Sequence, residues 1–184
     1  GRGGHGALFG SKNLKAVAAR GTMDIKIAHP KEALEFNKRF ISQITSAKVN
    51  ETQGTLGTPF IWGATNSWGG IRTRNFQYNQ CGYADDIEPE HLDEIATETI
   101  GPYHMTGCFG CQVHCRAQYK IPSGLYAGVY DEGPEYTSQG AFCGETDTPR
   151  AVALLTANHL VNKYGVDNLE IGSLISWAME LYEL

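Results

Sequence analysis

Apolar side chains in residues 30–46 recur at the three- and four-residue spacing of one face of an α-helix. Pro30 suits the first turn of a helix, because the N–H that proline lacks would have no partner there. The apolar positions that follow it are Ala33, Leu34, Phe36, Phe40, Ile41 and Ile44. The pattern predicts an amphipathic helix that begins at Pro30 and ends at Ser46.

Three further segments carry the start and stop signals of helices. Residues 89–100 form the first, and residues 149–164 form the second, with Thr148 as N-cap and Gly165 as the stop. Asp167, with an acidic residue three positions later, resembles a capping box and opens a last helix. The C-terminal third of the chain is therefore expected to be helical.

The N-terminal residues combine a glycine-rich turn with an apolar stretch. Residues 1–6 are GRGGHG, and two interpretations stay open for them. They form an ordinary turn, or their amides and Arg2 hold an anion such as a cofactor phosphate. Residues 14–20 predict a β-strand that Gly21 closes.

Residues 50–82 are rich in Gly, Thr, Asn and aromatic side chains and show no sustained period. A loop of this length in a compact domain is usually functional, or elements within it have escaped assignment. Trp62 and Trp68 could line a substrate channel, and packing in a core or lid is the commoner use of such aromatics.

Composition and charge narrow the classes of protein. The 184 residues allow one domain, or one domain with a piece of another. Lys and Arg number 15 against 20 Asp and Glu, without a basic block, so nucleic-acid binding is not expected. No apolar run is long enough to span a membrane, and no signal sequence is recognisable. The chain starts without Met and ends within a helical pattern, so we expect a fragment.

Three of the five cysteines lie within eight residues. Cys108, Cys111 and Cys115 have the spacing C-x2-C-x3-C, and Gly110 permits the tight backbone path that would let their thiolates converge. This clustering favours a metal site in a reducing compartment over a disulfide framework, so we expect a cytoplasmic protein.

The identity of the metal stays open at this point, because three thiolates require a fourth ligand. Zinc would take His104 or His114, and an iron–sulfur cubane would take a fourth cysteine, for which Cys81 and Cys143 are present. Ordinary buried cysteines are the third interpretation, and for Cys143 a small buried hydrophobic role is favoured.

Several segments, in this order, resemble the tungsten or molybdenum aldehyde ferredoxin oxidoreductase family. They are GRGG at 1–4 with GSKNLKA at 10–16, the three cysteines, EGPEY at 132–136, Asn158-His159 with YGVD at 164–167, and AMELYE at 178–183. The resemblance covers essentially the whole chain. It would make the chain the middle part of a longer protein.

The resemblance implies an α+β fragment that is mainly α-helical. Residues 1–27 would be the end of a sheet-rich pterin-binding domain. Residues 28–184 would form the first helical domain, which carries the iron–sulfur ligands.

The family also implies a [4Fe–4S] cluster and a tungsten or molybdenum bis-pyranopterin. Cys108, Cys111 and Cys115 match three of the four cluster ligands, and the fourth is expected beyond Leu184. Asp167 matches the family's D-x-x-G-L-D/C segment, so its carboxylate could accept pterin N–H groups, cap a helix, or do both. The residues implied to bind the pterin cofactor are Arg2, Gly3, Gly4, Asn162, Gly165, Val166 and Asp167. Asn162 departs from the family, which has Asp at that position.

A second departure concerns the catalytic positions. The family often has Glu-Tyr-Glu after Gly-Pro, whereas this chain has Glu135-Tyr136-Thr137. Thr137 does not titrate near neutral pH. Either Glu135, Glu132 or Glu145 replaces the missing acid, or a histidine elsewhere does, or the substrate differs. Glu135 and Thr137 are the candidate catalytic positions.

The resemblance implies an oxidoreductase that converts an aldehyde and water to a carboxylate and passes electrons through the cluster to ferredoxin or a similar carrier. One alternative is another low-potential reaction, the reduction of a carboxylate or an aromatic thioester. Another is a non-enzymatic module that binds zinc or a cluster. The protein could form a homo-oligomer, and this piece alone is expected to be inactive.

Overall fold

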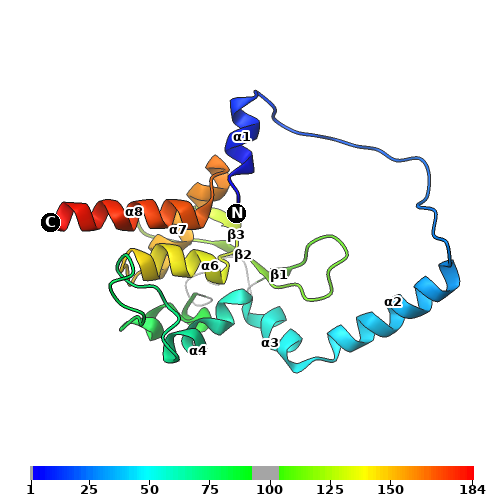
Figure 1. The fold of residues 1–184 in the computed structure, drawn as a ribbon, viewed down its shortest axis with the longest axis horizontal. Coiled ribbons are helices and arrows are strands. Elements are labelled where there is room, and N and C mark those ends of the chain that lie inside the picture. Colours follow the sequence, from blue (N-terminus) through cyan, green and yellow to red (C-terminus); the bar gives the residue numbers. More distant parts are fainter. Residues whose placement is uncertain (1, 93–103) are drawn as a thin grey trace.

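The computed structural model describes residues 2–92 and 104–184, and it is mainly helical with a small antiparallel sheet (Figure 1). The expected α+β, mainly α-helical class is therefore confirmed. The elements are α1 (His5–Ser11), α2 (Pro30–Thr45), α3 (Lys48–Leu56), η1 (Thr58–Ile61), α4 (Trp62–Ser67), η2 (Ala84–Ile87), β1 (His104–Thr106), β2 (Arg116–Lys120), β3 (Tyr130–Glu132), α6 (Tyr136–Gln139), η3 (Gly140–Glu145), α7 (Ala151–Tyr164) and α8 (Asn168–Glu183). Within the described ranges, no helix is both long enough and apolar enough to cross a membrane.

The predicted amphipathic helix is confirmed as α2, which begins at Pro30 and ends one residue before the predicted end. Its larger apolar side chains remain exposed except Ile44, which is half-buried, and Phe36 and Phe40 stack with their ring centroids 5.5 Å apart. Figure 1 shows α2 at the end of a long connection, apart from the main body. The predicted helix at 89–100 is helical from Pro89 to Leu92, and its remaining residues lie outside the described part.

The predicted strand at residues 14–20 is wrong. These residues have no regular secondary structure and are exposed, and the glycine turn before them leads into α1 instead. A β-strand requires a neighbouring strand to satisfy its N–H and C=O groups, and the described residues offer no such partner here. The apolar composition of residues 14–20 was therefore not sufficient to predict a strand.

The stretch 50–82 contains helices that its sequence did not reveal. It includes most of α3 and all of η1 and α4, each nine residues or shorter. Elements of this length complete too few turns to establish a hydrophobic period. Of the two alternatives for this stretch, the structure supports the one in which elements had escaped assignment.

The sheet has the order β1-β2-β3 and is antiparallel throughout. Gln118 in the central strand pairs with His104 on one side and with Glu132 on the other. Ala117 and Tyr119 point into the protein, and the Tyr119 hydroxyl donates to the Leu155 carbonyl at 2.6 Å. That hydrogen bond fixes the sheet against α7.

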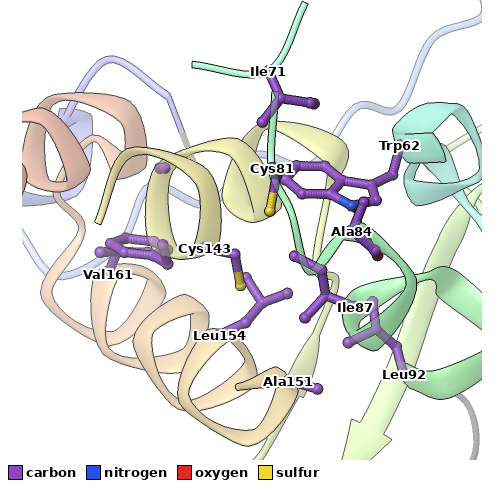
Figure 2. Close-up of a cluster of buried hydrophobic side chains, with 12 residues drawn as sticks. Trp62, Ile71, Cys81, Ala84, Ile87, Leu92, Cys143, Ala151, Leu154 and Val161 are labelled. Carbon is purple, nitrogen blue, oxygen red and sulfur yellow. Dashed lines mark hydrogen bonds between the residues drawn. The ribbon is translucent and has the colours of Figure 1, made fainter. Parts of the chain in front are cut away.

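The main core lies between α4, η2, η3 and α7. Figure 2 shows Trp62, Cys81, Cys143 and Leu154 among its buried side chains. Trp62 is fully buried and donates its indole N–H to the Ala84 carbonyl at 3.2 Å. Core packing is thus confirmed for Trp62, whereas Trp68 is 72% exposed.

Helices α7 and α8 confirm most of the predicted C-terminal pattern. Gly165 ends α7 in the left-handed conformation with φ 66°, and Asp167 is the N-cap of α8. The predicted start of α7 is wrong, because the helix begins at Ala151 with Arg150 as N-cap. The Thr148 hydroxyl donates to the Thr146 carbonyl at 3.2 Å and so caps no helix.

Helix α8 packs closely against η3, a π-helix. A Cβ added to Gly172 of α8 would lie 2.6 Å from the Ala141 Cβ and 2.9 Å from the Ala141 carbonyl oxygen. Contacts this short do not occur in packed proteins, so only glycine allows the observed approach. The position of η3, and of the segment that precedes it, depends on this contact.

We expect Gly172→Ala to lower the free energy of unfolding by about 1–3 kcal/mol, because overpacking outweighs the roughly 1 kcal/mol gain in helix propensity. Gly10→Ala in α1 is the matched control, since a Cβ there meets nothing within 4 Å. Urea unfolding of the two variants and the wild type measures the difference. A Gly172→Ala protein as stable as Gly10→Ala would contradict the close contact.

Candidate functional site

All three clustered cysteines lie on the hairpin connection between β1 and β2. The Cys111 N–H donates to the Cys108 carbonyl at 2.9 Å, which forms a tight turn. Gly110 within that turn has φ 72°, and His114 has φ 54°. Because paired strands fix both ends of the connection, the cysteines are confined to one short loop.

The backbone of the loop influences its thiols in different ways. The Val113 N–H donates to Cys111 Sγ at 3.4 Å, and with the His114 N–H it lowers the pKa of the Cys111 thiol. Burial raises the pKa of Cys115, and so do the negative charge of Glu135 and the neighbouring Cys111 and Cys108. Cys111 is therefore the thiol that the fold favours most clearly as a thiolate.

Across residues 2–92 and 104–184, no three His, Cys, Asp or Glu side chains are close enough together to hold a metal ion. The loop thus supplies three soft thiol donors on a short backbone path but does not draw them into a closed site. The donor set and the N–H groups directed at sulfur fit an iron–sulfur cluster, whose cysteine thiolates accept such hydrogen bonds.

The other candidate ligands occupy different surroundings. Cys81 and Cys143 are buried in the main core, and burial raises the pKa of Cys143 to about 12. The interpretation of Cys143 as a small buried hydrophobic residue is thereby confirmed. His114 lies on the cysteine loop and is exposed, while the side chain of His104 lies outside the described part.

A pocket of about 410 Å³ lies next to the cysteine loop, since Arg116, the residue after Cys115, lines it. Of the predicted site residues it brings together Arg2, Glu135, Thr137 and Asn162. The remaining lining residues are Asp131, Glu132, Gly133, Ser138, Asn158 and Asn168. The pocket therefore joins the N-terminal loop, the EGPEYT segment and helices α7 and α8.

The carboxylate of Asp167 connects two ends of the chain. It accepts the N–H groups of Leu169 and Glu170 in α8 at 2.9 and 3.3 Å. It also accepts the Gly3 N–H and pairs with Arg2 Nε at 3.0 Å. The Gly3 N–H, with help from Arg2 and the two helix amides, holds the pKa of Asp167 well below its usual range. We call Arg2, Gly3 and Asp167 the Asp167 clasp.

Two glycines make the clasp sterically feasible. The Ala7 N–H donates to the Gly165 carbonyl at 2.9 Å, and a Cβ on Gly165 would lie 2.5 Å from the Gly6 Cα. A Cβ on Gly4 would lie 3.7 Å from the Asp167 backbone N. Of the residues implied to bind cofactor, the structure therefore brings together Gly3, Gly4, Gly165 and, beside them, Arg2, Val166 and Asp167.

Asn162, the remaining residue of that set, lies at the pocket wall. Its amide donates to Asp131 Oδ1 at 3.4 Å and to the Glu132 carbonyl at 3.5 Å. The neighbouring His159 holds the other Asp131 oxygen at 3.0 Å. Asn162 thus stabilises β3 at the pocket. An aspartate at this position, as in the family, could not donate these hydrogen bonds when ionised.

A buried polar network along the pocket wall was not predicted from the sequence. Asn168 donates to Ser138, which donates to Asn158, at 3.0 Å each. Asn158 in turn donates to the Glu132 carbonyl at 2.9 Å and to the Tyr119 hydroxyl at 3.2 Å. Two features of the sequence could have indicated this network. They are the Asn158-His159 motif and the position of Asn168 directly after Asp167, the N-cap of α8.

One atom of this network is unsatisfied. Asn168 Oδ1 is buried and has no hydrogen-bond partner among the described residues, although Asn168 lines the pocket. A buried acceptor without a donor costs about 1–3 kcal/mol, so the site favours a group that supplies a donor. A pterin ring edge carries such N–H groups, and in this respect the pocket fits that cofactor.

The candidate acids divide between two locations. Glu135 lines the pocket and accepts the Thr58 hydroxyl at 2.5 Å, while Glu132 lines it and pairs with Arg116 at 3.1 Å. Glu145 is fully buried elsewhere, where it pairs with Arg72 at 2.9 Å and is not part of the pocket lining. Of the three acids proposed to replace the missing glutamate, Glu135 and Glu132 line the pocket and Glu145 does not.

We expect Asp167→Asn to destabilise the protein by on the order of 1 kcal/mol near neutral pH, because the new amide N–H opposes the N–H groups of the clasp. The folded-state pKa of Asp167 lies below the unfolded value of about 3.9, so its contribution is present above that pH and is lost as the pH falls. The difference between the unfolding midpoints of wild type and variant should therefore shrink progressively as the pH falls from about 4 toward the lower folded-state pKa.

Glu170→Gln is the control for this prediction, because it removes an exposed carboxylate from the same turn of α8. It should leave the unfolding midpoint nearly unchanged across the pH range. A difference between Asp167→Asn and wild type that is independent of pH would contradict the role of the charged carboxylate.

Comparison with known proteins gives the family. Residues 35–184 match the model of "Aldehyde ferredoxin oxidoreductase, domains 2 & 3". The chain is 33% identical over 186 residues to a tungsten-containing aldehyde ferredoxin oxidoreductase of Pyrococcus horikoshii, and 31% identical over 189 residues to that of Thermococcus kodakarensis. It is 29% identical to the WOR-like subunit of an aliphatic sulfonate oxidoreductase of Pyrococcus furiosus.

These matches cover 100% of the chain, which spans 29% of the length of the P. horikoshii and T. kodakarensis proteins and 28% of the P. furiosus subunit. The matched region includes the cysteine loop, most of the pocket lining and Asp167. The resemblance that the ordered motifs indicated is confirmed, and the chain belongs to the aldehyde ferredoxin oxidoreductase family.

Proposed function

We propose that the protein containing this chain oxidises an aldehyde with water to a carboxylate and passes the electrons to ferredoxin or a similar carrier. The observation that carries the proposal is the adjacency of two sites. Cys115 belongs to the thiol loop, and the next residue, Arg116, lines the pocket that the Asp167 clasp borders. An oxidoreductase of this kind needs its substrate site next to its first electron acceptor.

Cys108, Cys111 and Cys115 would hold a [4Fe–4S] cluster, which accepts and donates single electrons when bound. Cys81 and Cys143 are buried in the main core, so we propose that a residue outside this chain supplies the fourth ligand. Hydrogen bonds such as that from Val113 to Cys111 would stabilise the thiolate form of the ligands.

The pocket would take a tungsten or molybdenum pyranopterin, and that cofactor supplies the two-electron chemistry. The guanidinium N–H groups of Arg2 beyond Nε and the Gly4 N–H would face its phosphates, while Gly3, whose N–H donates to Asp167, would hold this loop in place. Asn162, Gly165 and Val166 would form the opposite side. In this proposal Asp167 acts mainly by positioning Arg2 and Gly3, since its oxygens already accept N–H groups of the chain.

Glu135 and Glu132 are the proposed proton carriers of the pocket wall. Thr137 stands where the family often has an acid, and its hydroxyl accepts from Asn168 at 3.4 Å. It can therefore orient a substrate or water by hydrogen bonding but not move a proton near neutral pH. This substitution favours a second candidate function, the reduction of a carboxylate or aromatic thioester.

The domain boundary is also proposed on the structure. Residues 12–29 form an exposed connection between α1 and α2, without regular secondary structure past the first turn. We propose that residues 1–27 belong to a pterin-binding domain and residues 28–184 to a helical domain. The family match from residue 35 onward supports a boundary in this region.

We expect Cys111→Ser in the full-length protein to lose iron, acid-labile sulfide and the broad visible absorption of an iron–sulfur cluster, because a serine hydroxyl is a poor thiolate substitute. Cys143→Ala is the matched control, since this cysteine is buried in the core. Metal and sulfide analysis with absorption spectroscopy measures both. Full iron and sulfide content in Cys111→Ser would overturn the cluster assignment.

A further inference from the structure

Glu135 lies where the cysteine loop meets the pocket. Gly57 packs against the loop, since a Cβ there would lie 3.1 Å from the Cys115 carbonyl oxygen. The next residue, Thr58, donates its hydroxyl to Glu135 Oε2 at 2.5 Å. The Glu135 carboxylate is thereby tied to the segment that contacts Cys115.

The Thr58–Glu135 hydrogen bond is itself held in place. The Thr58 hydroxyl oxygen accepts the Tyr136 N–H at 2.8 Å while its proton is directed at Glu135. Thr58 follows a glycine at φ 71° and begins η1, so its backbone position is fixed on both sides. Rotation of the carboxylate away from Thr58 would break this two-part arrangement.

The other charged groups of the pocket lining have a charged partner or several hydrogen-bond partners. Arg2 pairs with Asp167 at 3.0 Å and Arg116 pairs with Glu132 at 3.1 Å, while Asp131 forms hydrogen bonds with His159 at 3.0 Å and with the Glu132 N–H at 2.7 Å. Glu135 differs, because within the described ranges it forms no ion pair and its hydrogen-bond donor is a neutral hydroxyl. Its negative charge is therefore the least compensated in the pocket wall.

We propose that the Glu135 carboxylate, in its ionised form and held by Thr58, lowers the reduction potential of the group bound at Cys108, Cys111 and Cys115. A negative charge nearby disfavours the addition of an electron, and net charge is among the main determinants of iron–sulfur potentials.

This inference rests on the proposed cluster and adds a specific role for a residue of the chain. Glu135 would act on electron transfer through its charge, as a positioning and tuning residue on the cluster side of the pocket. A low potential suits delivery of electrons to a ferredoxin-type acceptor.

The test is a redox titration of the full-length, cluster-loaded protein with dithionite and mediators, followed by electron paramagnetic resonance. Glu135→Gln keeps an oxygen acceptor for Thr58 and removes the charge, so the midpoint potential should shift to a more positive value with unchanged iron content. Thr58→Val keeps the charge of Glu135 but removes the hydrogen bond that holds the carboxylate. We expect it to shift the midpoint potential in the same direction by a smaller amount.

Glu35→Gln is the matched control, because it makes the same chemical change on the exposed helix α2 and should leave the potential unchanged. An unchanged or more negative potential in Glu135→Gln would overturn the inference while leaving the cluster proposal intact. Loss of iron from Glu135→Gln would also overturn it, in favour of a structural role. Absence of iron and sulfide from the wild type would overturn the proposed function and this inference together.

Discussion

One carboxylate organises the relation between the N-terminal loop and the helical body. Asp167 accepts N–H groups from Arg2, Gly3, Leu169 and Glu170, which bind the GRGG loop to the start of α8. The contact is possible because Gly6 and Gly165 approach more closely than any side chain would permit. The pocket wall that includes Arg2 depends on this arrangement, and so does the registration of α1 on the α7–α8 turn.

A second constraint acts from the opposite side of the pocket. The antiparallel pairing of β1 with β2 closes the cysteine loop, and the pairing of β2 with β3 places Glu132 beside Arg116. The buried network of Asn158, Ser138 and Asn168 then connects β3 to α6 and α8. The thiol loop and the pocket are consequently parts of one connected unit.

The sequence predicted those features that local signals encode. The helix from Pro30, the Gly165 stop and the Asp167 cap each depend on a few neighbouring residues, and the structure has all three. The start of α7 was misplaced by two residues, because Thr148 forms a local turn with Thr146 that resembles a cap in sequence. Short elements such as β1 and α4 left no periodic signal.

Contacts between residues far apart in the sequence could not be predicted from local sequence patterns. Arg2 and Asp167 are separated by 165 positions, and nothing in their neighbourhoods indicates that they meet. The family resemblance grouped them as cofactor residues but gave no direct contact between them. Conversely, the apolar residues 14–20 looked like a strand, although the described chain gives them no strand to pair with. The Glu135–Thr58 contact likewise joins segments 77 positions apart.

The central claim is that the cysteine loop and the adjacent pocket hold two different redox groups. Anomalous diffraction from crystals of the full-length protein, recorded at the iron, zinc and tungsten or molybdenum edges, tests it most directly. We expect iron density bonded to the sulfur atoms of Cys108, Cys111 and Cys115, and heavier-metal density at the adjacent pocket. Zinc density alone at the cysteines, with no heavier metal beside the pocket, would contradict it.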